Sequence, residues 1–183
     1  MIIGITGTNA SGKEMVAEIL GQSGFSKFSC SDVIREVART RGLSTDRGPL
    51  TALANELRAA HGPGVLGRRV YEMIKEKGIS DAVVVSIRNP MEAEALKAHG
   101  DFFLLWVDAD PMVRYRRSSE RKRDGGDLLS FEGFMALERA EHDAGPTGCR
   151  LNKMQELASF TLRNDGSMEE LRDKVLAITA RLR

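Results

Sequence analysis

The stretch Gly7-Thr8-Asn9-Ala10-Ser11-Gly12-Lys13 decides the fold of this chain. It follows a short, apolar and β-branched run at residues 1–6, which predicts a buried strand. Lys13 then opens a segment with apolar residues on one helical face. Glycines let successive backbone N–H groups point into one concave nest, and the helix N-terminus adds partial positive charge. The sequence therefore predicts a phosphate-binding loop, since a plain strand–turn–helix corner would need no lysine there.

Strand and helix patterns alternate along the rest of the chain. Residues 82–87 and 102–107 are continuous apolar runs, which suit parallel strands covered on both faces. Shorter runs at residues 25–30 and 160–163 predict two more strands. Helices are predicted at residues 32–41, 51–60, 65–77, 90–98, 131–142, from 111 onward and from 168 to the C-terminus, with a loop at 43–49. This alternation predicts a three-layer α/β fold with a parallel sheet, and 183 residues suit one domain.

Composition excludes several classes of function. The net charge of +1 excludes a polybasic nucleic-acid coat, so no nucleic-acid polymer is expected as a partner. No run of about 18 apolar residues is present, so no membrane span is expected. Cys30 and Cys149 are far apart and have no cysteine or histidine cluster near them, which argues against a zinc site and for the cytoplasm. Small molecules are the expected partners, and the oligomeric state stays open.

A cationic cluster follows the second long apolar run. Its members are Arg114, Arg116, Arg117, Arg121, Lys122 and Arg123. On a helix, positions 114, 117 and 121 share one face. The cluster could simply be a solvated helix end. The glycine-rich residues 124–127 that follow favour a lid that closes over phosphates and excludes water.

Together these motifs resemble the P-loop nucleotide kinases, in particular the dephospho-CoA kinase and the nucleoside monophosphate (adenylate, cytidylate) kinase families. Residues 3–13 are similar to the start of dephospho-CoA kinases, and residues 158–167 to their C-terminal segment. Residues 31–35 resemble the Asp-x-x-Arg that opens the acceptor-binding helix in both families. Residues 85–88 resemble the strand-end arginine that monophosphate kinases place on the acceptor phosphate, and residues 117–121 the Arg-x-x-x-Arg at the lid hinge.

The resemblance implies a P-loop nucleoside triphosphate hydrolase fold in one domain, residues 1–183. Its core would be residues 1–30, 79–118 and 150–183, with an acceptor-binding insert at 31–78 and a lid at 119–149. The reaction would be transfer of the γ-phosphoryl group of ATP, with Mg²⁺, to a small nucleotide.

The resemblance also implies roles for individual residues. ATP would be bound by Gly7, Thr8, Asn9, Ala10, Ser11, Gly12, Lys13, Glu14 and Asn164. The catalytic residues would be Lys13, Arg117, Arg121 and Asp32. The acceptor would be bound by Asp32, Arg35, Arg58 and Arg88.

One departure concerns the metal. Glu14 stands where the families carry the hydroxyl that ligates Mg²⁺ directly. Glu14 could hold the metal through water, or Asp108 at the end of a strand could hold it, or the metal-dependent chemistry is impaired. Glu14 could equally be an acid that complements the helix dipole.

The acceptor is left open between two chemistries. A monophosphate is already an anionic nucleophile, so arginines such as Arg88 suffice. A 3′-hydroxyl, as in dephospho-CoA, needs a base, and Asp32 is the candidate. A second departure is that residues 86–90 lack the acidic and proline-rich segment of dephospho-CoA kinases. We favour a nucleoside or deoxynucleoside monophosphate; a nucleotide-binding regulatory protein without turnover is the alternative that the Glu14 replacement suggests.

Overall fold

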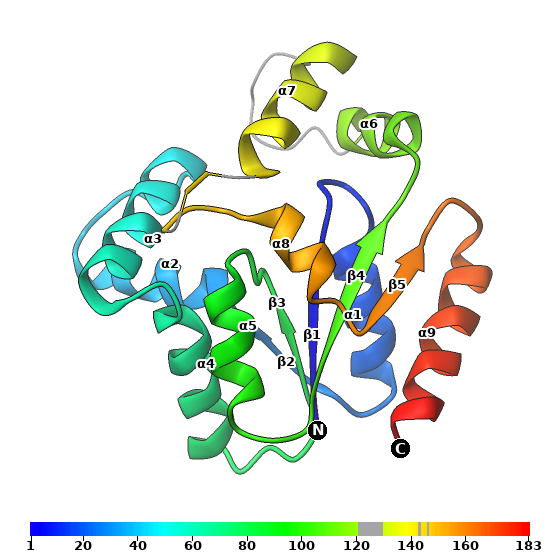
Figure 1. Ribbon diagram of the computed structural model, residues 1–183, viewed down its shortest axis with the longest axis horizontal. Coiled ribbons are helices and arrows are strands. Elements are labelled where there is room, and N and C mark those ends of the chain that lie inside the picture. The colour runs from blue at the N-terminus through cyan, green and yellow to red at the C-terminus, as the bar shows by residue number, and fades with distance from the viewer. Residues whose placement is uncertain (121–129, 143, 146) are drawn as a thin grey trace.

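The computed structural model describes residues 1–120, 130–142, 144–145 and 147–183 (Figure 1). The elements in chain order are β1 (Ile2–Gly7), α1 (Lys13–Gln22), β2 (Ser26–Ser29), α2 (Cys30–Thr40), α3 (Arg47–His61), α4 (Val65–Glu76), β3 (Ala82–Val85), α5 (Pro90–Lys97), β4 (Phe102–Asp108), α6 (Pro111–Glu120), α7 (Phe131–His142), α8 (Leu151–Glu156), β5 (Phe160–Arg163) and α9 (Met168–Leu182). None of the helices in the described part is long and apolar enough to cross a membrane.

The sheet places the predicted phosphate-binding loop at its centre. The strand order is β2-β3-β1-β4-β5, and every pairing is parallel. Ile3 of β1 lies between Val83 of β3 and Phe103 of β4. All five strands therefore end at one edge, and the loop after β1 lies where the chain switches from one half of the sheet to the other. That crevice is where open α/β sheets bind their ligands.

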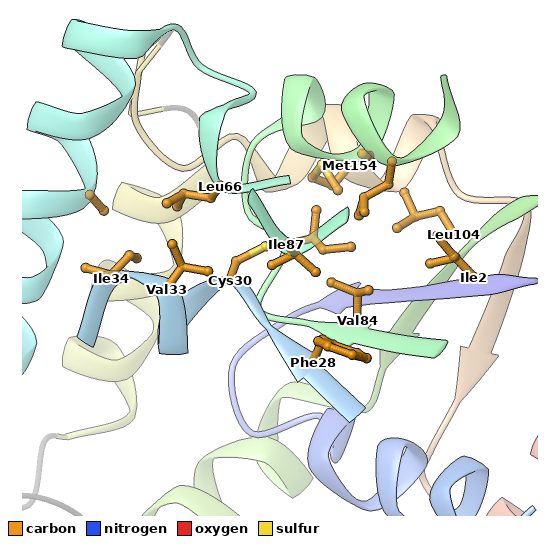
Figure 2. Close-up of a cluster of buried hydrophobic side chains, with 14 of the residues drawn as sticks. Ile2, Phe28, Cys30, Val33, Ile34, Leu66, Val84, Ile87, Leu104 and Met154 are labelled. Atoms are coloured by element: carbon orange, nitrogen blue, oxygen red, sulfur yellow. The ribbon is translucent and has the colours of Figure 1, made fainter. Parts of the chain in front are cut away.

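Helices cover both faces of the sheet. Val84 and Leu104 belong to a cluster built with α2, α3, α4, α5 and α8, and Figure 2 shows Val84 next to Phe28 and Leu104 next to Ile2. Alternate residues, such as Val83, point to the opposite face and pack with α1 and α9. This two-sided burial explains why β3 and residues 102–107 of β4 are apolar without interruption. The predicted three-layer P-loop fold is confirmed.

One local prediction was wrong, and one short helix was missed. The segment 43–49 was predicted as a loop, but α3 already begins at Arg47 and contains Pro49 in its first turn. Proline is tolerated there because the first N–H groups of a helix have no intrahelical acceptor. The short helix α8 was not predicted, since six residues with two buried positions, Leu151 and Met154, give no measurable periodicity.

The predicted insert and lid correspond to recognisable parts of the fold. Residues 31–78 contain most of α2 and all of α3 and α4, and Figure 1 shows α2 and α3 to one side of the sheet, beyond β2. The described part of residues 119–149 contains α7, which lies with α6 above the carboxyl ends of β1 and β4 (Figure 1). The functional boundaries themselves remain predictions.

Candidate functional site

The loop between β1 and α1 contains three residues with positive φ: its two glycines and Ala10, which has φ 56°. Gly7 has φ 136° and Gly12 has φ 95°, both in the left-handed half of the map. A Cβ atom on Gly7 would collide with the carbonyl oxygen of Val107 in β4. A Cβ atom on Gly12 would collide with the side-chain amide of Asn164. The glycine spacing is therefore required by close approach as well as by backbone conformation.

Side chains from neighbouring strands hold this loop in place. Thr8 Oγ1 donates to Asp108 Oδ1 at 2.6 Å, at the end of β4. Asn164, which follows β5, donates from Nδ2 to the Ser11 carbonyl at 2.8 Å. The Ser11 hydroxyl in turn donates to the Thr8 carbonyl at 2.9 Å. The loop is thus fixed before any ligand arrives, and Asn164, predicted to bind ATP, lies directly against it.

Lys13 folds back onto its own loop. Its Nζ donates to the carbonyl oxygens of Gly7, at 3.0 Å, and of Thr8. Burial, and then the nearby Arg88 guanidinium, lower the pKa of Lys13 from 10.5 to about 7. Lys13 is therefore close to its titration point at neutral pH, and a phosphate beside it would favour its charged form.

Glu141 contacts both Asn9, which is predicted to bind ATP, and Arg88, which is predicted to bind the acceptor substrate. Arg88, just beyond β3, donates from NH1 to Glu141 Oε2 at 3.0 Å. Asn9 in the loop donates from Nδ2 to the same oxygen at 3.0 Å. Glu141 belongs to α7, so the candidate lid helix contacts both the phosphate-binding loop and the predicted acceptor arginine. Glu141 could not be singled out from the sequence, because its two partners lie 53 and 132 residues away.

Arg114, a member of the cationic cluster, has a structural role. It is 3% exposed and pairs through both terminal nitrogens with Glu138 of α7, which is 4% exposed. Arg114 is therefore not available to a ligand, although it lies three residues from Arg117 on the same helix, α6. Arg117 donates from NH1 to the carbonyl of Asn164 at 2.9 Å, beside the loop. Arg121 lies outside the described residues.

The remaining predicted acceptor residues fall into two different environments. Asp32 and Arg35 form an ion pair in the first turns of α2, with Oδ1 and NH1 2.9 Å apart, and the Asp32 side chain is 69% exposed. Arg58 is buried, and its Nε and NH2 donate to Glu92 Oε1 at 2.9 and 2.8 Å. Glu92 is itself fully buried and caps α5. Arg58 thus faces a buried carboxylate and has a structural partner, while Asp32 and Arg35 face solvent.

The carboxylates predicted to hold Mg²⁺ already have protein partners. Glu14 forms an exposed ion pair with Lys27 of β2. The Oδ1 atom of Asp108 accepts from Thr8, and its Oδ2 atom lies 3.4 Å from NH1 of Arg163. Nowhere among the described residues do three histidine, cysteine, aspartate or glutamate side chains gather as metal ligands. Because Mg²⁺ in such sites is usually held by one or two carboxylates together with the substrate's phosphates, Glu14 and Asp108 stay the residues that could contact it, each after leaving its present partner.

Comparisons with known proteins place this geometry in a family. The sequence model of the AAA domain matches residues 3–130, more than half of the chain. A UPF0200 protein of Methanoregula boonei is 31% identical over 95% of the chain and 93% of its own length. The chain belongs to the AAA domain family and to UPF0200. A UPF0200/UPF0201 protein of Archaeoglobus fulgidus is 34% identical over 99% of the chain, but the chain spans only 55% of that relative's length.

Solved structures support the fold of this UPF0200 chain. TT1252 from Thermus thermophilus is 27% identical, with a TM-score of 0.60 over 100% of the chain and 98% of its own. A dephospho-CoA kinase from Campylobacter jejuni reaches a TM-score of 0.55 at 15% identity, over 99% of the chain and 96% of its own. A shikimate kinase from Bacteroides thetaiotaomicron reaches 0.59 at 12% identity, over 98% of both chains. At such low identities the two kinases show the fold alone. The chain therefore has a P-loop kinase-like fold.

Proposed function

We propose that this UPF0200 chain is an ATP-dependent phosphotransferase that acts on a small-molecule acceptor. The observation that carries the proposal is the loop of residues 7–13, fixed by Asp108 and Asn164, with Lys13 hydrogen-bonded to the loop's own carbonyl groups. Phosphoryl transfer asks a protein mainly for positioning and for preorganised positive charge. A rigid loop that leads into the N-terminus of a helix supplies the positioning, and the helix N-terminus and Lys13 supply the positive charge.

The chain's own residues divide the work between donor and acceptor. The backbone N–H groups of residues 8–14 would bind the donor phosphates, and Lys13 would leave its two carbonyl acceptors for a phosphate oxygen. Arg117, next to Asn164, would stabilise the transferring group, as would Arg121. The α7 helix above the loop would exclude water, which otherwise would hydrolyse ATP.

The acceptor that we propose is a nucleoside or deoxynucleoside monophosphate. Arg88 supports this choice, because it is the predicted acceptor arginine that lies next to the phosphate-binding loop and already holds an anion, the Glu141 carboxylate. Arg35 and Arg58 give the monophosphate less support. Each already forms an ion pair with a carboxylate, Arg35 with Asp32 and Arg58 with Glu92.

A hydroxyl acceptor, as in dephospho-CoA, is the second candidate. The observation that favours it is the exposed Asp32 carboxylate at the start of α2, held by Arg35 and available as a general base. A nucleotide-binding regulator without turnover is a third candidate, supported by the pairing of Glu14 with Lys27 in place of a metal-ligating hydroxyl.

A coupled assay of ADP formation over a panel of nucleoside monophosphates, deoxynucleoside monophosphates and dephospho-CoA tests the proposal. With a monophosphate, Arg88→Ala should raise KM roughly 10- to 100-fold, the value of one lost charge-assisted bond. Asp32→Asn should change that activity little, because a phosphate needs no base. Arg39→Ala, an exposed arginine on α2, is the matched control.

The same variants discriminate the candidates. If Arg88→Ala leaves activity unchanged and Asp32→Asn abolishes it, the acceptor is a hydroxyl group and not a monophosphate. Tight ADP binding with no ADP formed from ATP for any acceptor would favour the regulatory protein.

A further inference from the structure

The carboxylate of Glu141 lies where the polar groups of the candidate site converge. One oxygen, Oε2, accepts from the loop amide of Asn9 and from the guanidinium of Arg88, each at 3.0 Å, and the side chain is 19% exposed. After the dominant effect of burial, Arg88 lowers and Glu141 raises the pKa of Lys13. The charge of Glu141 therefore reaches Lys13, and the carboxylate neutralises part of the positive charge expected to attract phosphates.

The fold delivers this carboxylate through a helix that is anchored one turn earlier. Glu138 of α7 is buried against Arg114 of α6, and Phe134 of the same helix is 6% exposed beneath the Arg114 guanidinium. Positions 138 and 141 are three residues apart and so lie on the same face of α7. The first carboxylate fixes the helix over the loop, and the second, less buried one, extends to Asn9 and Arg88.

A ligand can take the place of Glu141 beside Arg88. The pair that Arg58 forms with Glu92 in the interior cannot be exchanged in this way. Arg58 and Glu92 are 5% and 0% exposed, and separating them would leave both charges buried. Arg88 is different, because its side chain is 38% exposed and an incoming anion can replace Glu141 without leaving the guanidinium unpaired.

We propose that Glu141 is a built-in competitor for the acceptor: its carboxylate occupies an anion position between Asn9 and Arg88 in the unliganded protein, and the acceptor's phosphate displaces it. The name of the ligand rests on the proposed function, whereas the anion position itself does not. A phosphate monoester carries about −1.5 to −2 charge at pH 7 and a carboxylate carries one. The competitor therefore selects for phosphorylated acceptors over those that carry only a carboxylate or a hydroxyl.

Glu141→Gln separates this role from a merely structural one. Glutamine keeps the shape and one acceptor oxygen but removes the charge. If Glu141 competes with anions, the variant should bind inorganic phosphate about tenfold more tightly than wild type, because about an order of magnitude in affinity is the value of one charge-assisted contact to Arg88. If Glu141 only tethers α7, the variant should be less stable and should bind phosphate no better. Glu132→Gln is the matched control, because it removes one exposed charge from the first turn of the same helix.

The measurement is isothermal titration of inorganic phosphate into wild type and both single variants at one fixed salt concentration. A gain in Glu141→Gln that is absent from Glu132→Gln and lost in the double variant Glu141→Gln/Arg88→Gln supports the competitor. Equal phosphate affinity in wild type and Glu141→Gln overturns it. Should Glu141→Gln fail to fold, Glu141→Asp, which withdraws the carboxylate by one methylene, should show a smaller gain, and no gain there overturns the proposal as well.

The titration is independent of turnover, so the two proposals can fail separately. A gain in phosphate affinity without ADP formation from any acceptor would retain the competitor and remove the phosphotransferase. ADP formation without the gain would do the reverse.

Discussion

Replacing Lys13 by methionine should stabilise the fold and abolish nucleotide binding. Lys13 Nζ lies against the carbonyls of Gly7 and Thr8, and burial, reinforced by Arg88, lowers its pKa from 10.5 to about 7. One pKa unit corresponds to about 1.4 kcal/mol, so protonation of Lys13 at pH 7 destabilises the folded state by up to about 4 kcal/mol. Methionine has a similar volume and no charge, and therefore removes this penalty.

The pH dependence gives the sharper test. Because the pKa of Lys13 is lower in the folded state, the unfolded chain binds more protons between about pH 7 and 10.5, and wild-type stability rises with pH across that window. The advantage of Lys13→Met should therefore shrink by about 2 kcal/mol between pH 7 and pH 9 and stay constant below about pH 6.

Urea denaturation of both proteins at pH 6, 7, 8 and 9 measures this difference, and an ADP titration measures binding. Lys97→Met, which removes an exposed lysine from the last turn of α5, is the control. A Lys13→Met variant less stable than wild type at pH 7, or a stability difference that does not change with pH, would refute the assignment of Lys13 as a destabilising, partly buried cation. Unchanged ADP affinity would refute its role at the donor phosphates.

Three further changes follow from the site. Gly12→Ala should weaken ADP binding at least tenfold and lower stability by more than about 1 kcal/mol, because its φ is 95° and the new methyl would collide with Asn164; an ADP titration with normal affinity would contradict this. Glu138→Gln should lower the free energy of unfolding by about 3–5 kcal/mol, since it leaves the Arg114 charge buried without its partner. A loss under about 1 kcal/mol in urea unfolding would show that this pair does not anchor α7. Glu14→Ser breaks an exposed ion pair, so thermal unfolding should report a change under about 1 kcal/mol, and the Mg²⁺ dependence of ATP binding should stay the same; a changed Mg²⁺ dependence would show that Glu14 contacts the metal.

The sequence predicted those features that depend on a few adjacent residues. The glycines of the loop were found because their conformation leaves few alternatives, and both have positive φ. The start of α5 was found because Asn89, Pro90 and Glu92 form a capping box within one turn, and the structure contains that box. The parallel sheet followed from apolar runs such as residues 102–107, whose length and composition suit burial on both faces.

The partners of the arginines could not be predicted in the same way. Arg114 pairs with Glu138, 24 residues away, and Arg58 with Glu92, 34 residues away. A charge count cannot distinguish an arginine that faces a ligand from one that faces a distant buried carboxylate, because only tertiary packing brings the partners together. One signal was available: Glu138 and Glu141 are three residues apart on a predicted helix that follows an arginine-rich one.

Transfer of label from γ-³²P-ATP tests the central claim most directly. Wild type, incubated with labelled ATP and each nucleoside monophosphate, should move the label to the acceptor, giving a labelled diphosphate on thin-layer separation, and Lys13→Ala should not. Label that remains in ATP for every monophosphate and for dephospho-CoA, or that is released only as inorganic phosphate, would contradict the assignment of this chain as a phosphotransferase.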